Sequence, residues 1–310
     1  MSFVKRRITI QLQLNGDTFS EGGNTLELSN IRCRATIQAT IGGQTPCQSM
    51  LQLQIWGMTG DDMAKLSTLG LDSGVFNRNN ITILAGDQNS GMTQVFSGAI
   101  FNAFVDYNAQ PDVYVEIQAS STLGYQLASI PASSQKGSVS VPDMLKAICA
   151  ACTPTLNFVN NGVTGSLSNH AVGGDAKHQI DDICMALPCS NSIENGALTI
   201  WPIGGTSDGQ VISIDSNTGM VGYPCYNNHG IDVVMEFNPG VRLGRQLSVQ
   251  SSIPVPGPNA PTRPSGAAIV GATGTFYIYE VVHDLSAELP NGPWFTKAGC
   301  GSANTQADAS

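Results

Sequence analysis

The feature that most constrains the fold is a strict alternation of apolar and polar residues in several separate stretches. Ile8, Ile10, Leu12 and Leu14 alternate with Thr and Gln, and residues 31–41 repeat the pattern with Thr, Gln and Arg. Successive side chains of a β-strand point to opposite faces, so each stretch predicts a strand with one buried face and one solvated face. The solvated face carries mostly Thr, Gln and Asn, which indicates a surface that meets neighbouring subunits. The pattern favours an assembly component.

The composition agrees with a strand-rich chain of low charge. Charged residues are 12% of the 310 residues, and 34 glycines favour short strands joined by turns. The net charge of −9 opposes specific nucleic-acid binding, which needs clustered Lys and Arg. We find no apolar run that predicts a signal peptide or a membrane span. The eight cysteines are therefore expected to stay reduced.

The strand pattern occupies both ends of the chain. Residues 1–125 contain at least six predicted strands and a short helix at 60–69, which suggests a closed or nearly closed antiparallel barrel or a sandwich. Residues 208–310 return to strands, with a closing strand predicted at 276–283 and a tail from 301 that is expected to fray. The first and last thirds can be two versions of one β-domain.

The segment between them has a different character. Residues 126–207 contain two predicted helices, at 141–152 and 175–187, and a hairpin that turns at Asn195-Gly196. Strands and short helices in so short a segment predict a small α+β domain.

One cysteine spacing in this middle segment could bind metal. Cys149-Ala-Ala-Cys152 has the spacing of half a zinc site or of a redox pair. Other potential ligands follow in the sequence, namely Cys184, Cys189, His170 and His178. We favour a structural reading, because Cys149 and Cys152 lie at i and i+3 on an amphipathic helix, where small buried cysteines are common. No metal ligand is predicted.

The remaining chemical groups do not select an active site. His283-Asp284 could be half of a triad, but no Gly-x-Ser-x-Gly motif accompanies it, and we expect His283 to bond backbone or to pack at an interface. Glu116, Glu236 and Glu280 lie on alternating strands, and nothing selects two of them as a glycosidase pair. We therefore predict no catalytic residue, no cofactor and no enzymatic activity.

Two loops and the tryptophans are candidate contacts. Trp56 and Trp201 are expected to anchor a core or an interface. Trp294 lies in an exposed-looking turn, and both a partner contact and simple packing are open for it. The proline-rich loop 253–265 and the turn 290–295 are the predicted partner-facing elements.

Several segments together resemble a known family. At the N-terminal end they are Leu51-Gln-Leu-Gln-Ile-Trp-Gly-Met-Thr with the short helix after it, Ile81-Thr-Ile-Leu-Ala-Gly-Asp, and Val95-Phe-Ser-Gly-Ala-Ile. At the C-terminal end they are Gly219-Met-Val-Gly-Tyr-Pro, Asn238-Pro-Gly, Thr275-Phe-Tyr-Ile-Tyr-Glu-Val-Val-His-Asp and Gly292-Pro-Trp-Phe-Thr. The chain is similar in these segments to the baseplate hub proteins of contractile-tailed bacteriophages, over its first 125 and last 100 residues.

The resemblance implies a fold and an assembly. The expected fold is mainly β (α+β), with two tube-like antiparallel β-barrel domains, 1–125 and 208–310, and a small α+β domain, 126–207, between them. Three copies would present six such domains, so that a homotrimeric hub could join a sixfold tail tube protein to a threefold central spike protein. Such a hub lines the DNA exit channel during genome ejection. It would be assembled in the host cytoplasm and located in the virion, at the tail baseplate.

Other partners and other functions stay open. Further baseplate proteins are expected to contact the hub, and the tape measure protein is an additional candidate. A tail-associated cell-wall hydrolase and a zinc-binding tail protein are alternatives that would use the middle domain. A distal tail or tube-initiator protein of sixfold symmetry is a third, and it would need only one barrel per chain.

Overall fold

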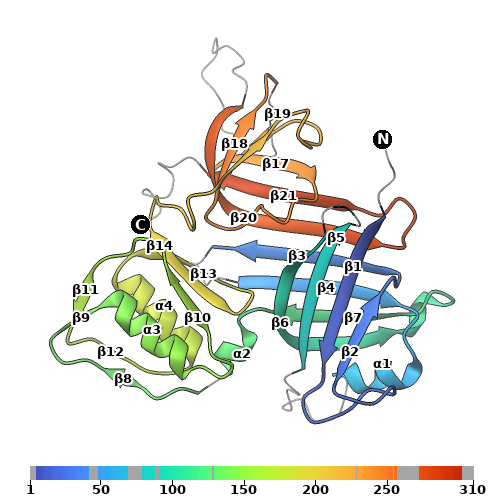
Figure 1. Cartoon of the computed structure of the whole chain (residues 1–310), viewed down its shortest axis with the longest axis horizontal. Helices are drawn as coiled ribbons and strands as arrows, with labels where there is room; N and C mark the ends of the chain where they lie inside the picture. The colour runs from blue at the N-terminus through green and yellow to red at the C-terminus, as the bar shows by residue number, and fades with distance from the viewer. Residues whose placement is uncertain are drawn as a thin grey trace.

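The structure is a computed structural model of the chain. It describes residues 5–41, 48–68, 79–87, 89, 91–127, 129–227, 229–253, 255–256 and 272–301. The fold is mainly β, as predicted, and most of the strand pairs are antiparallel (Figure 1). The predicted pair of closed barrels is not confirmed, because the hydrogen-bonded ladder of the described residues does not close on itself.

The described residues of the N-terminal part form seven strands, one α-helix and a short 3-10 helix. The strands are β1 (Arg6–Gln13), β2 (Thr25–Ser29), β3 (Cys33–Thr40), β4 (Gln48–Trp56), β5 (Asn80–Asp87), β6 (Gly91–Asp106) and β7 (Tyr114–Ser120). The helices are α1 (Gly60–Leu66) and η1 (Tyr107–Ala109). Helix α1 confirms the predicted helix at 60–69, although it ends at Leu66. Its N-cap is Thr59, whose hydroxyl accepts from the Asp62 N–H.

The middle part contains the two predicted helices and the predicted hairpin. Its elements are α2 (Leu123–Gln126), β8 (Ser133–Ser134), β9 (Ser138–Ser140), α3 (Val141–Ala151), β10 (Asn157–Asn160), β11 (Ser166–Ser168), β12 (Ala171–Val172), α4 (Ala176–Ala186), β13 (Cys189–Glu194) and β14 (Ala197–Pro202). Ser140 and Asp175 cap α3 and α4 through their side chains. Asn195 and Gly196 both have positive φ, as a two-residue hairpin turn requires.

The C-terminal part is again made of strands. They are β15 (Val211–Ile214), β16 (Cys225–Tyr226), β17 (Gly230–Glu236), β18 (Gln246–Gln250), β19 (Val255–Pro256), β20 (Thr273–Ala287) and β21 (Trp294–Gly301). The predicted closing strand at 276–283 is only part of β20, and the strand that follows it, β21, was not predicted. Most of the proline-rich loop 253–265 lies outside the described residues.

Strand β20 joins the two ends of the chain into one sheet. Its first half pairs with β18, and its second half, from Glu280 to Ala287, pairs with β3 from Thr40 to Cys33. The order β17-β21-β20-β3-β4-β7-β6 is therefore one continuous run of antiparallel neighbours, visible across the centre of Figure 1. A strand from the last third of the chain thus belongs to the sheet of the first third. The domain boundaries at 125/126 and 207/208 stay predictions.

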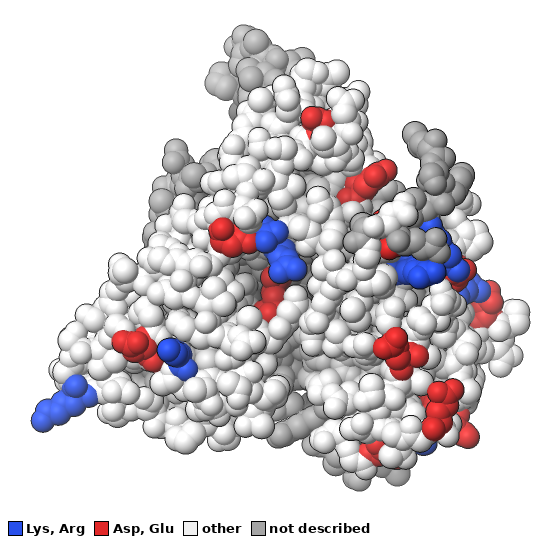
Figure 2. Space-filling model, in the orientation of Figure 1, with Lys and Arg blue, Asp and Glu red and all other residues white. Residues whose placement is uncertain are grey.

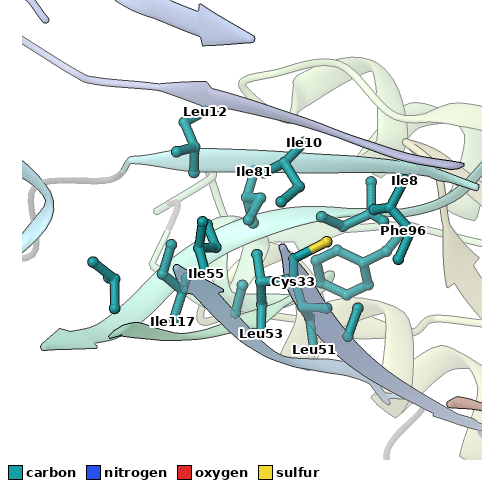
Figure 3. Packing of buried hydrophobic residues seen from close by; sticks show 14 of the residues in the cluster. Ile8, Ile10, Leu12, Cys33, Leu51, Leu53, Ile55, Ile81, Phe96 and Ile117 are labelled. Carbon is teal, nitrogen blue, oxygen red and sulfur yellow. The ribbon is translucent and has the colours of Figure 1, made fainter. Parts of the chain in front are cut away.

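Two hydrophobic clusters lie on the same side of this run. The first is centred on β1, β4 and β5 (Figure 3). It also includes Leu285 and Trp294 from the end of the chain. The second contains residues of β17, β18, β20 and β21. Strand β3 supplies Ile37 to the first cluster and Ala39 to the second. These side chains are two residues apart on one strand, so they point to the same face. A third cluster fills the middle part.

Side chains cross the gap between β1 and the β20–β21 turn, where the ladder is not closed. Lys5 Nζ lies 2.6 Å from Glu288 Oε1. Arg6 Nη1 donates to the Gly292 carbonyl at 3.4 Å, and the guanidinium carbon of Arg6 lies 5.8 Å from the centroid of the Trp294 ring. These exposed contacts connect the start of β1 to the β20–β21 turn without backbone pairing.

A polar sheet face as the candidate functional surface

The opposite side of the β17–β6 run forms a broad surface on which polar side chains outnumber apolar ones such as Phe295 and Val282, and we call it the polar sheet face. Its strands alternate between buried residues and partly or fully exposed ones, as predicted for 31–41. The polar residues that point outward are Arg34, Thr36, Gln38, Thr40, Gln48, Gln52, Gln54, Asn102, Asp106, Tyr114, Glu116, Gln118, Asp232, Glu236, Glu280, Asp284 and Lys297. Amide and hydroxyl groups outnumber the charges.

Hydrogen bonds between neighbouring strands fix many of these side chains. Arg34 binds both carboxylate oxygens of Asp284, through Nε at 3.3 Å and Nη2 at 3.2 Å. Gln38 Nε2 donates to Glu280 Oε1 at 2.7 Å. Both contacts cross from β3 to β20, and they therefore join side chains about 250 residues apart in the sequence.

The same arrangement continues toward β6. Gln52 Nε2 and Gln118 Nε2 both donate to Glu116 Oε1, at 3.1 and 3.0 Å. Asn102 Nδ2 donates to Gln118 Oε1 at 3.3 Å. The amides thus form a chain of hydrogen bonds over three strands and hold their side chains in place.

The charge of the polar sheet face is negative. Its two described cations both face a carboxylate: Arg34 faces Asp284, and Lys297 Nζ lies 3.7 Å from Asp232 Oδ2. Glu116, Glu236 and Glu280 have no ion pair with a described Lys or Arg. A phosphate backbone passing over this surface meets no unpaired cation among the residues described, so the electrostatic attraction that drives nonspecific DNA binding is small.

The predicted His–Asp pair is separated by its strand. Asp284 points to the polar sheet face, whereas His283 is buried on the other side and its Nδ1 lies 2.9 Å from Thr296 Oγ1. The Phe237 ring packs edge-on against His283, with centroids 5.5 Å apart. Burial, with a smaller contribution from Arg242, lowers the pKa of His283 to about 4. The two side chains therefore do not form the pair that a triad needs.

Glu116 and Glu280, two of the three carboxylates considered for glycoside cleavage, do not come together either. Glu116 lies on β7 and Glu280 on β20, with β3 and β4 between them. Three inter-strand steps separate the two strands by about 14 Å, well above the spacing of a retaining or inverting pair. Each of these two carboxylates accepts a hydrogen bond from a glutamine.

The cysteines of the middle part lie in its hydrophobic cluster. Cys149, Cys152, Cys184 and Cys189 are all buried there. Burial raises the pKa of Cys149 to about 12, and the Cys152 Sγ donates to the Ile148 carbonyl at 3.2 Å. Within the described ranges, no three His, Cys, Asp or Glu side chains form a group that could hold a metal ion. The buried arrangement agrees with the structural reading of these thiols.

The tryptophans have three different environments. Trp201 is fully buried and donates from Nε1 to Tyr277 Oη at 2.6 Å. Trp294 is 8% exposed and packs on Phe237 at 5.1 Å, so the exposed-looking turn holds a packed side chain. Trp56 lies at the end of the polar sheet face, where the Arg32 guanidinium stacks 4.6 Å from its ring centroid.

Solved structures share this fold. A tail protein from Neisseria meningitidis MC58 matches with a TM-score of 0.58 and 10% identity, over 96% of this chain and 98% of that one. The 43 kDa tail protein of prophage MuSo2 from Shewanella oneidensis matches with a TM-score of 0.52 and 9% identity, over 96% and 97%. The E. coli c3393 protein, a component of the type VI secretion system, matches with a TM-score of 0.53 and 9% identity, over 88% and 73%.

The fold is therefore one that solved phage tail proteins share. The sequence profile of the family described as baseplate hub gp41 matches residues 64–257, more than half of the chain. The chain belongs to the baseplate hub gp41 family, which confirms the resemblance drawn from the sequence. No curated protein sequence gives a significant match. None of the described helices is long and apolar enough to cross a membrane.

Proposed function

We propose that this chain forms a homotrimeric baseplate hub that joins a sixfold tail tube to a threefold central spike. Each chain contributes two β units, one around β1–β7 and one around β15–β21. Three chains then present six β units in a ring, which matches the symmetry of the tube on one side and of the spike on the other.

The observation that carries this proposal is the continuous run from β17 to β6. The hydrophobic clusters of the two β units lie on one side of it, and the polar sheet face lies on the other. One chain therefore contributes one continuous sheet that spans both β units and has one polar surface. A ring of such sheets encloses a channel if the polar sheet faces point inward.

The chemistry of the polar sheet face suits a channel for DNA. Its cations are paired, its net charge is negative, and Gln38, Gln52 and Gln118 each donate to a carboxylate. A passing phosphate backbone gains little from such a surface and is not retained. In this proposal the tail tube protein and the central spike protein are the axial partners, other baseplate proteins bind at the periphery, and the chain is a virion component without catalytic activity.

Native mass spectrometry of the full chain, together with a reconstruction of purified tails, tests the proposal. The expected result is a mass of three chains in solution or a threefold ring of this chain at the end of the tube. A stable monomer that is absent from purified tails overturns the hub assignment. A sixfold ring in the tails overturns the trimer and favours the distal tail alternative.

A further inference from the structure

Strand β2 is an open edge of the large sheet. It is the last strand in the order, and its described neighbour is β1, with Gln11 opposite Glu27. The Leu14 N–H donates to the Asn24 carbonyl at 2.8 Å, which fixes the phase of the β1–β2 ladder. In an antiparallel ladder the bonded pairs alternate, so Leu26 and Leu28 direct their N–H and C=O groups toward β1.

The residues of β2 that alternate with Leu26 and Leu28 direct their backbone N–H and C=O groups away from the sheet. The backbone groups of Thr25, Glu27 and Ser29 therefore point outward along the free edge. No backbone hydrogen bond joins them to any residue that the structure describes. Three exposed residues with outward donors and acceptors are enough to template one additional strand.

The surroundings of this edge are acidic. Glu27 is exposed at its centre, and Asp17, Glu21 and Asp61 are exposed on the adjoining loop and on α1. The loop and the helix are held together by Asp62, which accepts from the Ser20 N–H at 2.9 Å. Figure 2 shows several acidic groups over the lower right of the molecule, where Figure 1 places β2 and α1.

These carboxylates lack cationic partners within the molecule. None of the four forms an ion pair with a described Lys or Arg, and Glu27 is bonded only to the neutral Gln11 amide at 3.0 Å. Lys65, the lysine of α1, donates instead to the Thr18 carbonyl. The edge therefore presents uncompensated negative charge beside unpaired backbone groups.

The charge also argues against a second copy of the chain at this edge. In a two-fold antiparallel pair of β2 strands centred on the strand midpoint, Glu27 would lie opposite Glu27. Like charges directly opposite in a ladder destabilise the pair. A strand with Lys or Arg opposite Glu27 would instead gain attraction.

We propose that β2 is a docking edge at which an extended segment of another tail protein, carrying Lys or Arg, adds as a strand. The backbone groups of Thr25, Glu27 and Ser29 supply the hydrogen bonds. The carboxylates around β2 select a basic sequence. This inference rests on the edge and its charge, and it is independent of the number of hub copies in the ring.

Hydrogen–deuterium exchange tests this proposal. The exchange of the β2 amides is measured in purified tails and in the isolated full chain, and the two rates are compared. The Thr25, Glu27 and Ser29 amides are expected to exchange at least about tenfold more slowly in tails, because they become bonded there. The Leu26 and Leu28 amides serve as internal controls, since β1 already binds them in both states. Equal exchange of the edge amides in the two states overturns the proposal.

Carbodiimide coupling in the same tails identifies the occupant. A cross-link from Glu27 to a lysine of a different protein supports the proposal, whereas a cross-link to another copy of this chain overturns it. Glu27→Pro removes the central outward N–H without removing a bond to β1, and it is expected to abolish any cross-link from Asp17 or Glu21, on the loop before β2, to that protein. Glu27→Gln keeps the N–H and removes the charge. If the Thr25 and Ser29 amides stay as protected in tails of both variants as in the wild type, the proposed recognition is overturned. Thermal unfolding of the isolated variants verifies their fold.

Discussion

The buried imidazole of His283 makes the stability of the protein depend on pH in a calculable way. The folded state holds the ring in its neutral form, with a pKa lowered from 6.5 to about 4 by burial and by Arg242. The unfolded chain takes up a proton as the pH falls below 6.5, and the folded chain takes it up only near pH 4. The contribution of His283 is therefore fully present above pH 6.5 and is lost between pH 6.5 and pH 4.

The size of this effect follows from the shift. A difference of one pKa unit corresponds to about 1.4 kcal/mol, so the full loss is about 3 kcal/mol. Between pH 7 and pH 5 the unfolded state gains about 2 kcal/mol relative to the folded state from this one proton. That is a large part of the stability of an ordinary domain.

Urea unfolding followed by tryptophan fluorescence measures the loss. The free energy of unfolding is compared for the wild type and His283→Asn at pH 5, 6 and 7, at one protein concentration. The Asn side chain cannot titrate, so the advantage of the wild type over the variant should shrink by about 2 kcal/mol from pH 7 to pH 5. Taking this difference cancels the titration of groups elsewhere in the chain.

Thr296→Val is the matched control. It removes the Oγ1 partner of His283 and leaves the Asn238 N–H, 3.1 Å away, without its acceptor. It should cost about 1–3 kcal/mol at each pH and keep the wild-type pH dependence, since burial is the main cause of the shift. A parallel pH profile for wild type and His283→Asn would refute the reasoning, because the imidazole would then be protonated in the folded protein.

Three further predictions follow from the sheet and its clusters. A fragment 1–207 should fail to unfold cooperatively by calorimetry, because it lacks Leu285 and leaves β3 without its β20 neighbour; a sharp transition would show that the N-terminal unit folds alone. Ellman's reagent should leave Cys149 unmodified in the folded protein at pH 8 and label it in urea, since its thiol is buried with a pKa of about 12. Gln52→Lys on the polar sheet face should slow genome ejection at low salt and recover at high salt, whereas Gln13→Lys on β1 should not. Equal ejection rates for the two variants would oppose an inward-facing polar sheet face.

Local signals in the sequence predicted the elements well. The alternation at 31–41 predicted β3, because its period of two can be satisfied only by a strand with one buried face. Asn195-Gly196 predicted the β13–β14 turn, because both residues tolerate positive φ. Each of these signals is contained in a few consecutive residues.

The neighbours of the strands could not be predicted in this way. Alternation shows which side chains of β20 are buried, but it does not show that Glu280–Ala287 will pair with β3 rather than with another strand of the last third. For the same reason the sequence left open whether Trp294 packs or meets a partner, and the structure shows it packed. Its partner Phe237 lies far away in the sequence, while its own neighbours, Pro293 and Asn291, are typical of an exposed turn. The polar sheet face was predicted strand by strand, but its extent depends on the β3–β20 pairing.

The shared strand has a mechanical consequence for the proposed ring. If a flexible linker connected the two β units, each could rotate, and three chains would not hold six units at fixed angles. Here β20 passes from one hydrophobic cluster into the other, and it is bonded to β18 in its first half and to β3 in its second half. Rotation of one unit against the other would break the β20–β3 ladder and would withdraw Ala39 of β3 from the second cluster, while Ile37 stays in the first. The pairing of β20 with β3 is therefore what would allow three chains to imitate six rigid subunits.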